Sequence, residues 1–125
     1  QTMAATEITP IKLTSFNTIT KEIAATDFAA IDATNGAYFV MAKGGDKYVI
    51  GIKNAASTAG DKTITIKAGN GLQGTNDISL ALSKDEIAWV VLDSGKFKNV
   101  YGVNKGKVIL TGTDNNLQVK VIELP

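Results

Sequence analysis

The sequence predicts an all-β protein, a single sandwich of antiparallel strands with Greek-key connections and about eight or nine short strands. Three observations predict it. Apolar and polar residues alternate with a period of two, and residues typical of turns recur roughly every 8 to 12 positions. The chain has 125 residues, which is the usual length of one domain.

The alternation is clearest in residues 61–69, 76–84 and 116–125. A strand with one face in a core and one in water has this pattern, because successive side chains point to opposite faces. The residues that the pattern assigns to the buried face are Ile64, Ile66, Ile78, Leu80, Leu82, Leu117, Val119 and Val121.

Four other segments are apolar on both faces: residues 37–42, 47–52, 87–92 and 107–110. They are too short for ordinary helices and rich in strand-forming residues. A sandwich buries one face of each sheet, so a loop, the N-terminal segment or a neighbouring subunit must cover the second face. Trp89, in the most apolar strand, is predicted to be in the core. The residues that we expect at a protein interface on these strands are Tyr38, Val40, Ala88, Val90 and Leu92.

The chain divides into a short N-terminal segment and the sandwich. Residues 1–15 are predicted to be a first strand or an extended arm that pairs with a neighbour, and residues 16–125 form the sandwich domain. Residues 18–36 are harder to interpret. We favour a strand over 19–24 and a loop with one helical turn, and the alternative is a short helix with Thr20 as its N-cap.

The composition restricts the chemistry. The chain has no histidine and no cysteine, which removes the commonest general base and the usual soft metal ligands. All 13 basic residues are Lys, and 12 acidic residues balance them to a net charge of +1. No apolar run approaches the roughly 20 residues of a membrane span. We therefore expect no enzyme, no cofactor, no metal, and neither nucleic acid nor membrane as a partner.

The stretch "KAGNGLQGTND", residues 67–77, has the G-x-G-x-x-G spacing of a dinucleotide-binding loop at Gly69, Gly71 and Gly74. Such a loop must lead into a helix whose N-terminus faces the phosphates. The following residues alternate with period two and predict a strand. We interpret the stretch as a hairpin connection in which the glycines supply positive φ.

The stretch "VVLDSGKF" carries an Asp-Ser-Gly sequence like that of a dimeric aspartic protease. In that family the loop lies near the start of the chain, whereas Asp93 lies three quarters of the way along. An ordinary turn with local hydrogen bonds and positive φ is the favoured interpretation. If the protease interpretation held, Asp93→Asn would change a measurable property.

A basic cluster follows this turn, with Phe97 and Tyr101 among its lysines. It could bind an acidic partner or a nucleic-acid backbone, or it could be an edge hairpin whose lysines discourage strand pairing. From this cluster we expect Lys96, Phe97, Lys98 and Tyr101 at an interface. Further on, Asp114 and two Asn lack the spacing of a calcium loop and predict a hairpin turn.

Residues 92–125, "LDSGKFKNVYGVNKGKVILTGTDNNLQVKVIELP", resemble small phage head-decoration proteins, also called capsid cement proteins. The preceding "KYVIGIKNAASTAGDKTITIKAGNGLQGTNDISLAL" is similar to the Ig-like sandwich of such proteins. The resemblance covers roughly residues 38–125.

The resemblance implies a non-enzymatic virion protein, made in the host cytoplasm and bound to the capsid exterior. The implied partner is a major capsid protein, whose capsomers it would bridge and stabilise, and the implied oligomer is homomeric, often a trimer. The alternative is an Ig-like adhesive or carbohydrate-binding module of a surface or tail-fibre protein. In that case Tyr38, Tyr48, Trp89 and Tyr101 would form a platform for sugars.

Overall fold

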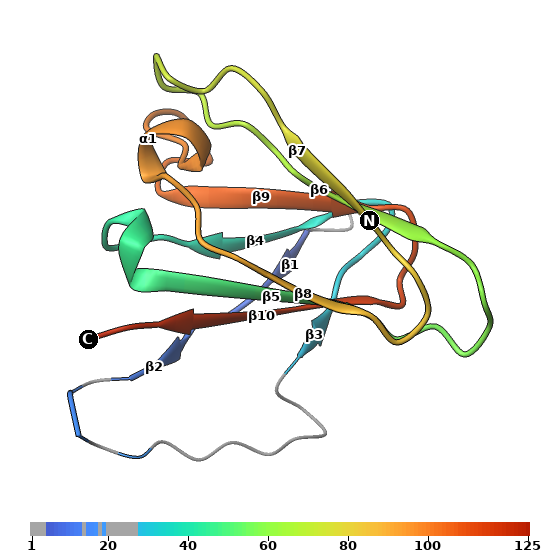
Figure 1. The fold of residues 1–125 in the computed structure, drawn as a ribbon. Coiled ribbons are helices and arrows are strands. Elements are labelled where there is room, and N and C mark those ends of the chain that lie inside the picture. The colour runs from blue at the N-terminus through green and yellow to red at the C-terminus, as the bar shows by residue number, and fades with distance from the viewer. Residues whose placement is uncertain (1–4, 14, 18, 20–27) are drawn as a thin grey trace.

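The computed structural model describes residues 5–13, 15–17, 19 and 28–125, and it is a β-sandwich of two facing sheets (Figure 1). The first sheet has the order β1-β4-β9-β6-β7 and the second β2-β10-β5-β8, with β3 also paired to β10. The bounds in the first sheet are β1 Thr6–Glu7, β4 Ala37–Val40, β9 Lys107–Gly112, β6 Lys62–Ile66 and β7 Ile78–Leu82. Those in the second are β2 Ile11–Lys12, β10 Leu117–Glu123, β5 Tyr48–Asn54, β8 Ile87–Val90 and β3 Ala29–Ala30. A 3₁₀ turn, η1 Gly45–Lys47, precedes β5, and a helical turn, α1 Ser94–Phe97, follows β8.

The predicted sandwich is confirmed, and its strand order is that of a jelly roll. From β3 onward the sheets read β3-β10-β5-β8 and β4-β9-β6-β7, so most consecutive strands lie in different sheets. Among the strands of the described residues, only β6 and β7 are consecutive and paired as a hairpin. In an immunoglobulin sandwich, by contrast, several neighbouring strands are consecutive in sequence. The chain therefore matches the Greek-key part of the prediction and differs from an Ig-like order.

The N-terminal segment closes one side of the sandwich. Strand β1 pairs with β4 and β2 pairs with β10, both in parallel, which makes the two sheets mixed rather than purely antiparallel. Ile8, between the two strands, is buried, and its N–H donates to the carbonyl of Tyr38. The described part of the predicted arm, residues 5–13, thus packs on its own domain. The strand considered for residues 19–24 and the helix start considered at Thr20 lie outside the described residues except at Ile19. Residues 28–36, where we favoured a loop with one helical turn, instead contain strand β3 and a tight turn in which the backbone N–H of Gly36 donates to the carbonyl of Asp32 (2.7 Å).

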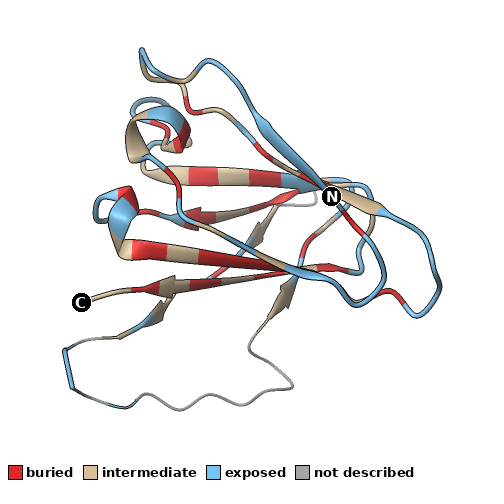
Figure 2. Ribbon diagram, viewed as in Figure 1, coloured by how far each residue is buried: buried red, intermediate tan, exposed pale blue. Residues whose placement is uncertain are grey.

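The core follows the alternation of the strands. Buried residues alternate with half-buried ones along β9 and β10 (Figure 2). The register places Ile50, Val90 and Val121 across one row of the second sheet, and Ile64 opposite Leu80 in the first. Most residues assigned to the buried face are confirmed as core. The exceptions are Ile78 and Leu80 of β7, which remain partly exposed.

Two predicted hairpins are instead connections between sheets. Residues 112–116 lead from β9 in the first sheet to β10 in the second, and the basic segment after α1 leads from β8 to β9. The Asp114 carboxylate accepts a hydrogen bond from the backbone N–H of Asn116 (2.7 Å). Such a turn can occur in a hairpin and in a link between two sheets, because its hydrogen bonds determine the local bend of the chain and not the strand with which the next strand pairs.

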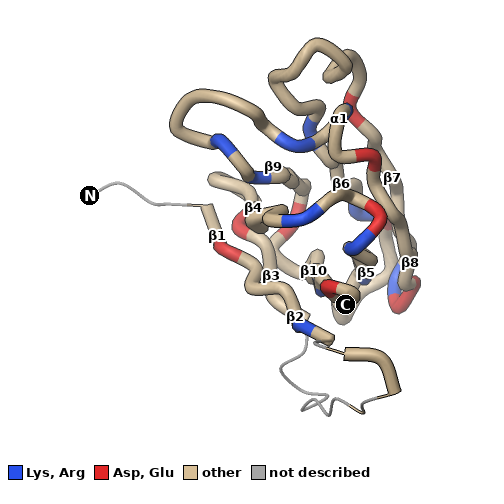
Figure 3. Tube along the Cα trace, turned by 90° about the vertical axis from the view of Figure 1, so that its left-hand side faces the viewer, with Lys and Arg blue, Asp and Glu red and all other residues tan. Residues whose placement is uncertain are grey.

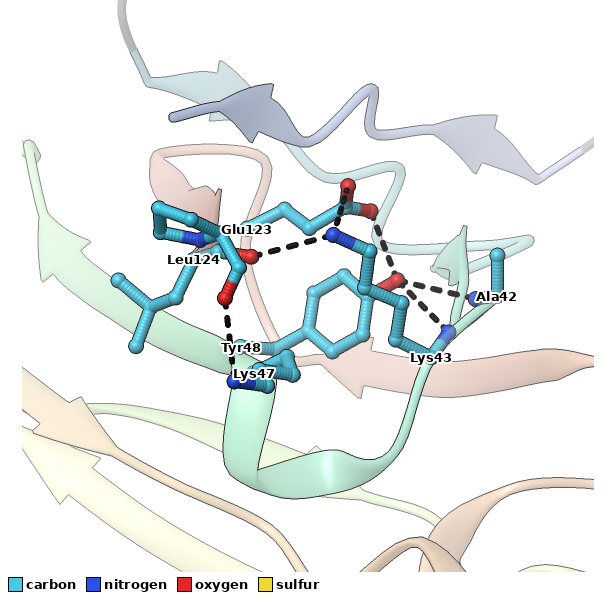
Figure 4. A network of polar contacts seen from close by, with 7 residues as sticks. Ala42, Lys43, Lys47, Tyr48, Glu123 and Leu124 are labelled. Carbon is cyan, nitrogen blue, oxygen red and sulfur yellow. Dashed lines mark hydrogen bonds and ion pairs between the residues drawn. The ribbon is translucent and has the colours of Figure 1, made fainter. Parts of the chain in front are cut away.

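A buried polar network fastens the last strand to the chain before β5 (Figure 4). The Tyr48 hydroxyl donates to Oε1 of Glu123 (2.8 Å) and accepts from the backbone N–H groups of Ala42 and Lys43. Lys43 Nζ also lies 3.5 Å from Oε2 of Glu123. Burial and the hydrogen bond to Glu123 raise the pKa of Tyr48. The network satisfies a carboxylate that lies inside the sandwich.

Candidate protein-docking surfaces

The glycine stretch of residues 67–77 is the loop of the β6–β7 hairpin. It leads from one strand into another, as predicted, and not into the helix that a dinucleotide site requires. The expectation of positive φ at its glycines is wrong, since positive φ occurs at Gly36, Gly60, Gly102 and Gly106. The loop needs glycine for space instead. A Cβ on Gly69 would lie 2.5 Å from the carbonyl oxygen of Lys98, and one on Gly74 would collide with the carbonyl of Gly69.

The Asp-Ser-Gly stretch begins α1. The Asp93 side chain is the N-cap and accepts a hydrogen bond from the backbone N–H of Gly95 (2.8 Å). The predicted local hydrogen bond is therefore confirmed, but Gly95 is not among the glycines with positive φ. The carboxylate of Asp93 therefore has a structural role as a helix cap.

Strand β8 presents an apolar row on the outer face of the second sheet. Ile87, Trp89 and Val91 are 50%, 54% and 57% exposed, and we call them the β8 stripe. Ala88 and Val90, the other half of the alternation, pack against the core, and Leu92 is buried. The prediction that Trp89 is a core residue is wrong. The predicted apolar surface exists on this strand, but the β8 stripe forms it, and not Ala88, Val90 and Leu92.

The outward position of Trp89 depends on a glycine in the next strand. Gly51 of β5 is the register partner of Trp89, and a Cβ on Gly51 would lie 2.5 Å from the indole ring. The ring therefore lies over a position of the sheet that has no side chain. The ring of Phe28 is near it, with a centroid distance of 6.5 Å and an interplanar angle of 58°, and Lys53 Nζ lies 4.5 Å from the Phe28 centroid. About half of Trp89 remains in solvent.

Beside the β8 stripe, the sandwich is open between its two edge strands. Strand β7 pairs only with β6 and β8 only with β5 within the described part of the chain. Between them is a groove of about 210 Å³ with a mainly apolar lining. Ile78 and Leu80 form one wall, which explains why these inward-facing residues are still 41% and 38% exposed.

A second apolar surface lies at one end of the sandwich, where two loops meet. We call it the loop end, residues 68–77 and 98–106. Four apolar side chains are exposed there: Leu72, Val100, Tyr101 and Val103. Leu72 and Val103 project farthest, with exposed fractions of 103% and 90%. Of the four, only Tyr101 was named from the sequence.

Lysines surround this loop end. A hollow of about 440 Å³ beside it is lined by Lys98 and Lys105 together with Val40 and Val100, and we call it the lysine hollow. Figure 3 shows basic positions beside α1 and on the loop that leads into β9. The structure thus brings together Val40, Lys98 and Tyr101 at one end of the molecule. Lys96 is exposed on α1 nearby.

The remaining named residues lie elsewhere. Phe97 is buried in the core and anchors α1 there. Tyr38 is on the outer face of the first sheet, where Lys107 Nζ lies 4.3 Å from its ring centroid and its hydroxyl donates to Glu7 (3.3 Å). Burial, and then the charge of Glu7, raise the pKa of Tyr38. Leu92 and Phe97 are therefore corrected from surface to core residues.

The four aromatic residues of the alternative sugar platform do not share a face. Tyr48 is buried, Tyr38 lies on the first sheet, Trp89 on the second, and Tyr101 at the loop end. A platform for sugar rings needs exposed aromatic faces side by side. The arrangement therefore gives no support to that function by these residues.

The described residues hold no cluster of three or more His, Cys, Asp or Glu side chains that could bind a metal ion. Their helices are also too short and too polar to cross a membrane. No protein-family model matches the chain, no curated protein matches it, and no solved structure matches it.

Proposed function

We propose that the chain is a non-enzymatic structural protein that binds the outer surface of a phage capsid and bridges its capsomers. The observation that supports this proposal is the presence of two separate apolar surfaces on one small sandwich, the β8 stripe and the loop end. Exposed apolar patches on a folded domain usually mark protein interfaces. A protein that bridges neighbours needs at least two of them.

The partner in this proposal is the major capsid protein, and copies of the chain, for example as trimers, are the second partner. The resemblance of residues 38–125 to head-decoration proteins supports both. Contacts that are individually weak become effective on a lattice, because binding at one surface raises the local concentration at the other. No catalytic group is required for this task.

The test is co-sedimentation with expanded, undecorated capsids of the phage whose genome encodes the chain. The expected result is that the protein pellets with the shells and saturates at a stoichiometry fixed by the lattice. Unexpanded shells, which present a different surface, are the control. If the protein stays in the supernatant at every capsid concentration, the proposal is wrong.

The adhesive alternative predicts a different result. A carbohydrate-binding module would be retained on immobilised glycans and would show no saturation on capsids. Because the four aromatic residues lie on different faces, we expect no retention.

A further inference from the structure

The loop end combines exposed apolar side chains with lysines, and together these two features indicate one kind of binding partner. Its apolar tips project into solvent, and the hollow beside them is lined by two lysines and by no acidic side chain. We infer that the loop end is the surface that meets the shell, and that it binds an acidic protein patch with an apolar pocket. This inference rests on the proposed function and specifies the chemistry of its partner.

The apolar tips are convex. Leu72 and Val103 are almost completely exposed, so each can enter a pocket of a partner without rearranging its own surroundings. Val100 and Tyr101 lie between Lys98 and Val103 in sequence and are 48% and 64% exposed. An apolar side chain that a partner removes from water contributes to affinity in proportion to the apolar surface that is buried.

The two loops are held in place before any partner binds. The Asn70 side chain accepts a hydrogen bond from the backbone N–H of Val100 (2.7 Å) and donates to the carbonyl of Tyr101 (2.9 Å). One amide thus connects the hairpin loop to the loop before β9. The backbone N–H of Gly69 donates to the carbonyl of Lys96 (2.9 Å), which links the hairpin loop to α1, directly before the second loop.

Each loop is also anchored at its base. The Asp77 carboxylate accepts from the backbone N–H of Ala68 (2.6 Å) and pairs with Lys67 Nζ (3.0 Å), and these interactions hold the pKa of Asp77 below its usual range. Asn99 is buried, and its side chain donates to the carbonyl of Lys107 (3.0 Å). Loops ordered in this way lose little entropy on binding, which favours a docking role.

The charges define the partner. The lysine hollow has Lys98 and Lys105 in its lining and no acidic side chain. The ion pairs found among the described residues involve neither of these lysines, nor Lys96 on α1. A partner with Asp or Glu opposite the hollow would pair with these free cations. Because the tips are apolar, the same partner must offer an apolar pocket next to its carboxylates.

The experiment compares two pairs of substitutions in the capsid co-sedimentation assay. Leu72→Ser with Val103→Ser removes the tips, and Lys98→Gln with Lys105→Gln removes the charges of the hollow. Ile19→Ser is the matched control for an exposed apolar residue, and Lys84→Gln, on the β7–β8 turn, is the control for an exposed lysine. Circular dichroism and a thermal melt of each variant verify that it folds.

We expect each loop-end pair to weaken capsid binding by about tenfold or more, since one pair removes buried apolar surface and the other removes charge pairs from the contact. The controls should bind as the wild type does. Raising the salt concentration should weaken wild-type binding, and the lysine variant should respond less to salt because fewer charges remain to be screened.

The possible outcomes distinguish a failure of this inference from a failure of the proposed function. If wild-type protein does not pellet with capsids, the proposed function fails. If it pellets and both loop-end variants bind equally well, the function stands and the inference is wrong. If only the apolar variant weakens and salt has no effect, the acidic partner is wrong. Vesicles with phosphatidylserine are a further arm: loss of vesicle binding in variants that keep capsid binding would overturn the inference in favour of a lipid surface.

Discussion

Tyr48 is the residue on which the buried polar network depends. Its hydroxyl has no solvent exposure and joins three groups, the Glu123 carboxylate and the N–H groups of Ala42 and Lys43. Tyr48→Phe keeps the ring and removes the hydroxyl, which leaves these groups without that partner inside the protein. An unsatisfied buried polar group costs about 1 to 3 kcal/mol, and more when it is charged.

We therefore expect Tyr48→Phe to lower the free energy of unfolding by about 2 to 4 kcal/mol, measured by urea denaturation at neutral pH. Tyr38→Phe is the matched control. Its hydroxyl makes one hydrogen bond, to Glu7 at the surface, so its loss should change stability by about 0.5 kcal/mol or less. Equal losses in the two variants would contradict the role assigned to the network.

The same residue gives a pH dependence. The pKa of Tyr48 is raised above its ordinary value of 10.0, so the folded state favours the protonated hydroxyl. The stabilisation is complete below pH 10 and is lost as pH rises through the folded pKa. Above pH 10, wild-type protein should thus lose stability more steeply than Tyr48→Phe. Parallel curves for the two proteins would mean that the Tyr48 hydroxyl has the same pKa in the folded and unfolded states, which would contradict the raised pKa.

At the scale of the element, the glycines of the hairpin loop, residues 67–77, have two possible explanations: a phosphate-binding loop or a loop that is too crowded for side chains. A phosphate cradle would need all three glycines, because the backbone approaches the ligand along the whole loop. The observed loop needs only two. Gly69 and Gly74 face backbone atoms at close range, whereas a Cβ on Gly71 would meet Val100 at an ordinary 3.5 Å.

Alanine at Gly69 or Gly74 is therefore expected to destabilise the protein by about 1 to 3 kcal/mol, the usual cost of overpacking. Alanine at Gly71 should leave the melting temperature within about one or two degrees of wild type, because surface changes are mostly small. Thermal denaturation of the three variants measures this. A loss at Gly71 as large as at the other two would contradict the steric explanation.

The strands show which features of the fold the sequence could predict and which it could not. The period of two identifies the strands and the two faces of each, since alternation is a local property. It does not identify which face of a doubly apolar strand is buried. On β8 the answer depends on Gly51, which is distant in sequence and makes room for Trp89 outside. The isolated glycine within "KYVIGIK" was the available clue.

The local sequence pattern also could not predict which turns connect the two sheets, and the reason is similar. The turn at Asp114 has the same hydrogen bonds in a hairpin as in a link between sheets. Which of the two forms depends on the strand that β10 pairs with, and that is β5, more than 60 residues earlier. Phe97 gives a further example. Among lysines it was expected at a surface, but one turn of α1 directs it into the core.

At the scale of the whole molecule, the proposed function predicts two effects that can be measured separately: attachment to a shell and stabilisation of that shell. The β8 stripe belongs to the second sheet, and the loop end extends from the hairpin and from the connection into β9 of the first sheet. A chain that keeps one surface can still attach to a shell, but it cannot join two neighbours. Attachment and stabilisation should therefore respond differently to the same substitution.

Trp89→Ser is the variant that separates them. We expect it to pellet with expanded capsids, with an affinity reduced by about tenfold through the loss of effective concentration. Shells carrying it at saturation should melt at the temperature of undecorated shells, because the second contact is missing. Wild-type protein at the same occupancy should raise that temperature. Thr58→Ser, in the exposed loop between β5 and β6, is the control and should stabilise shells as wild type does. If Trp89→Ser stabilises shells fully at equal occupancy, the β8 stripe is not a bridging surface, and the loop end must supply both contacts.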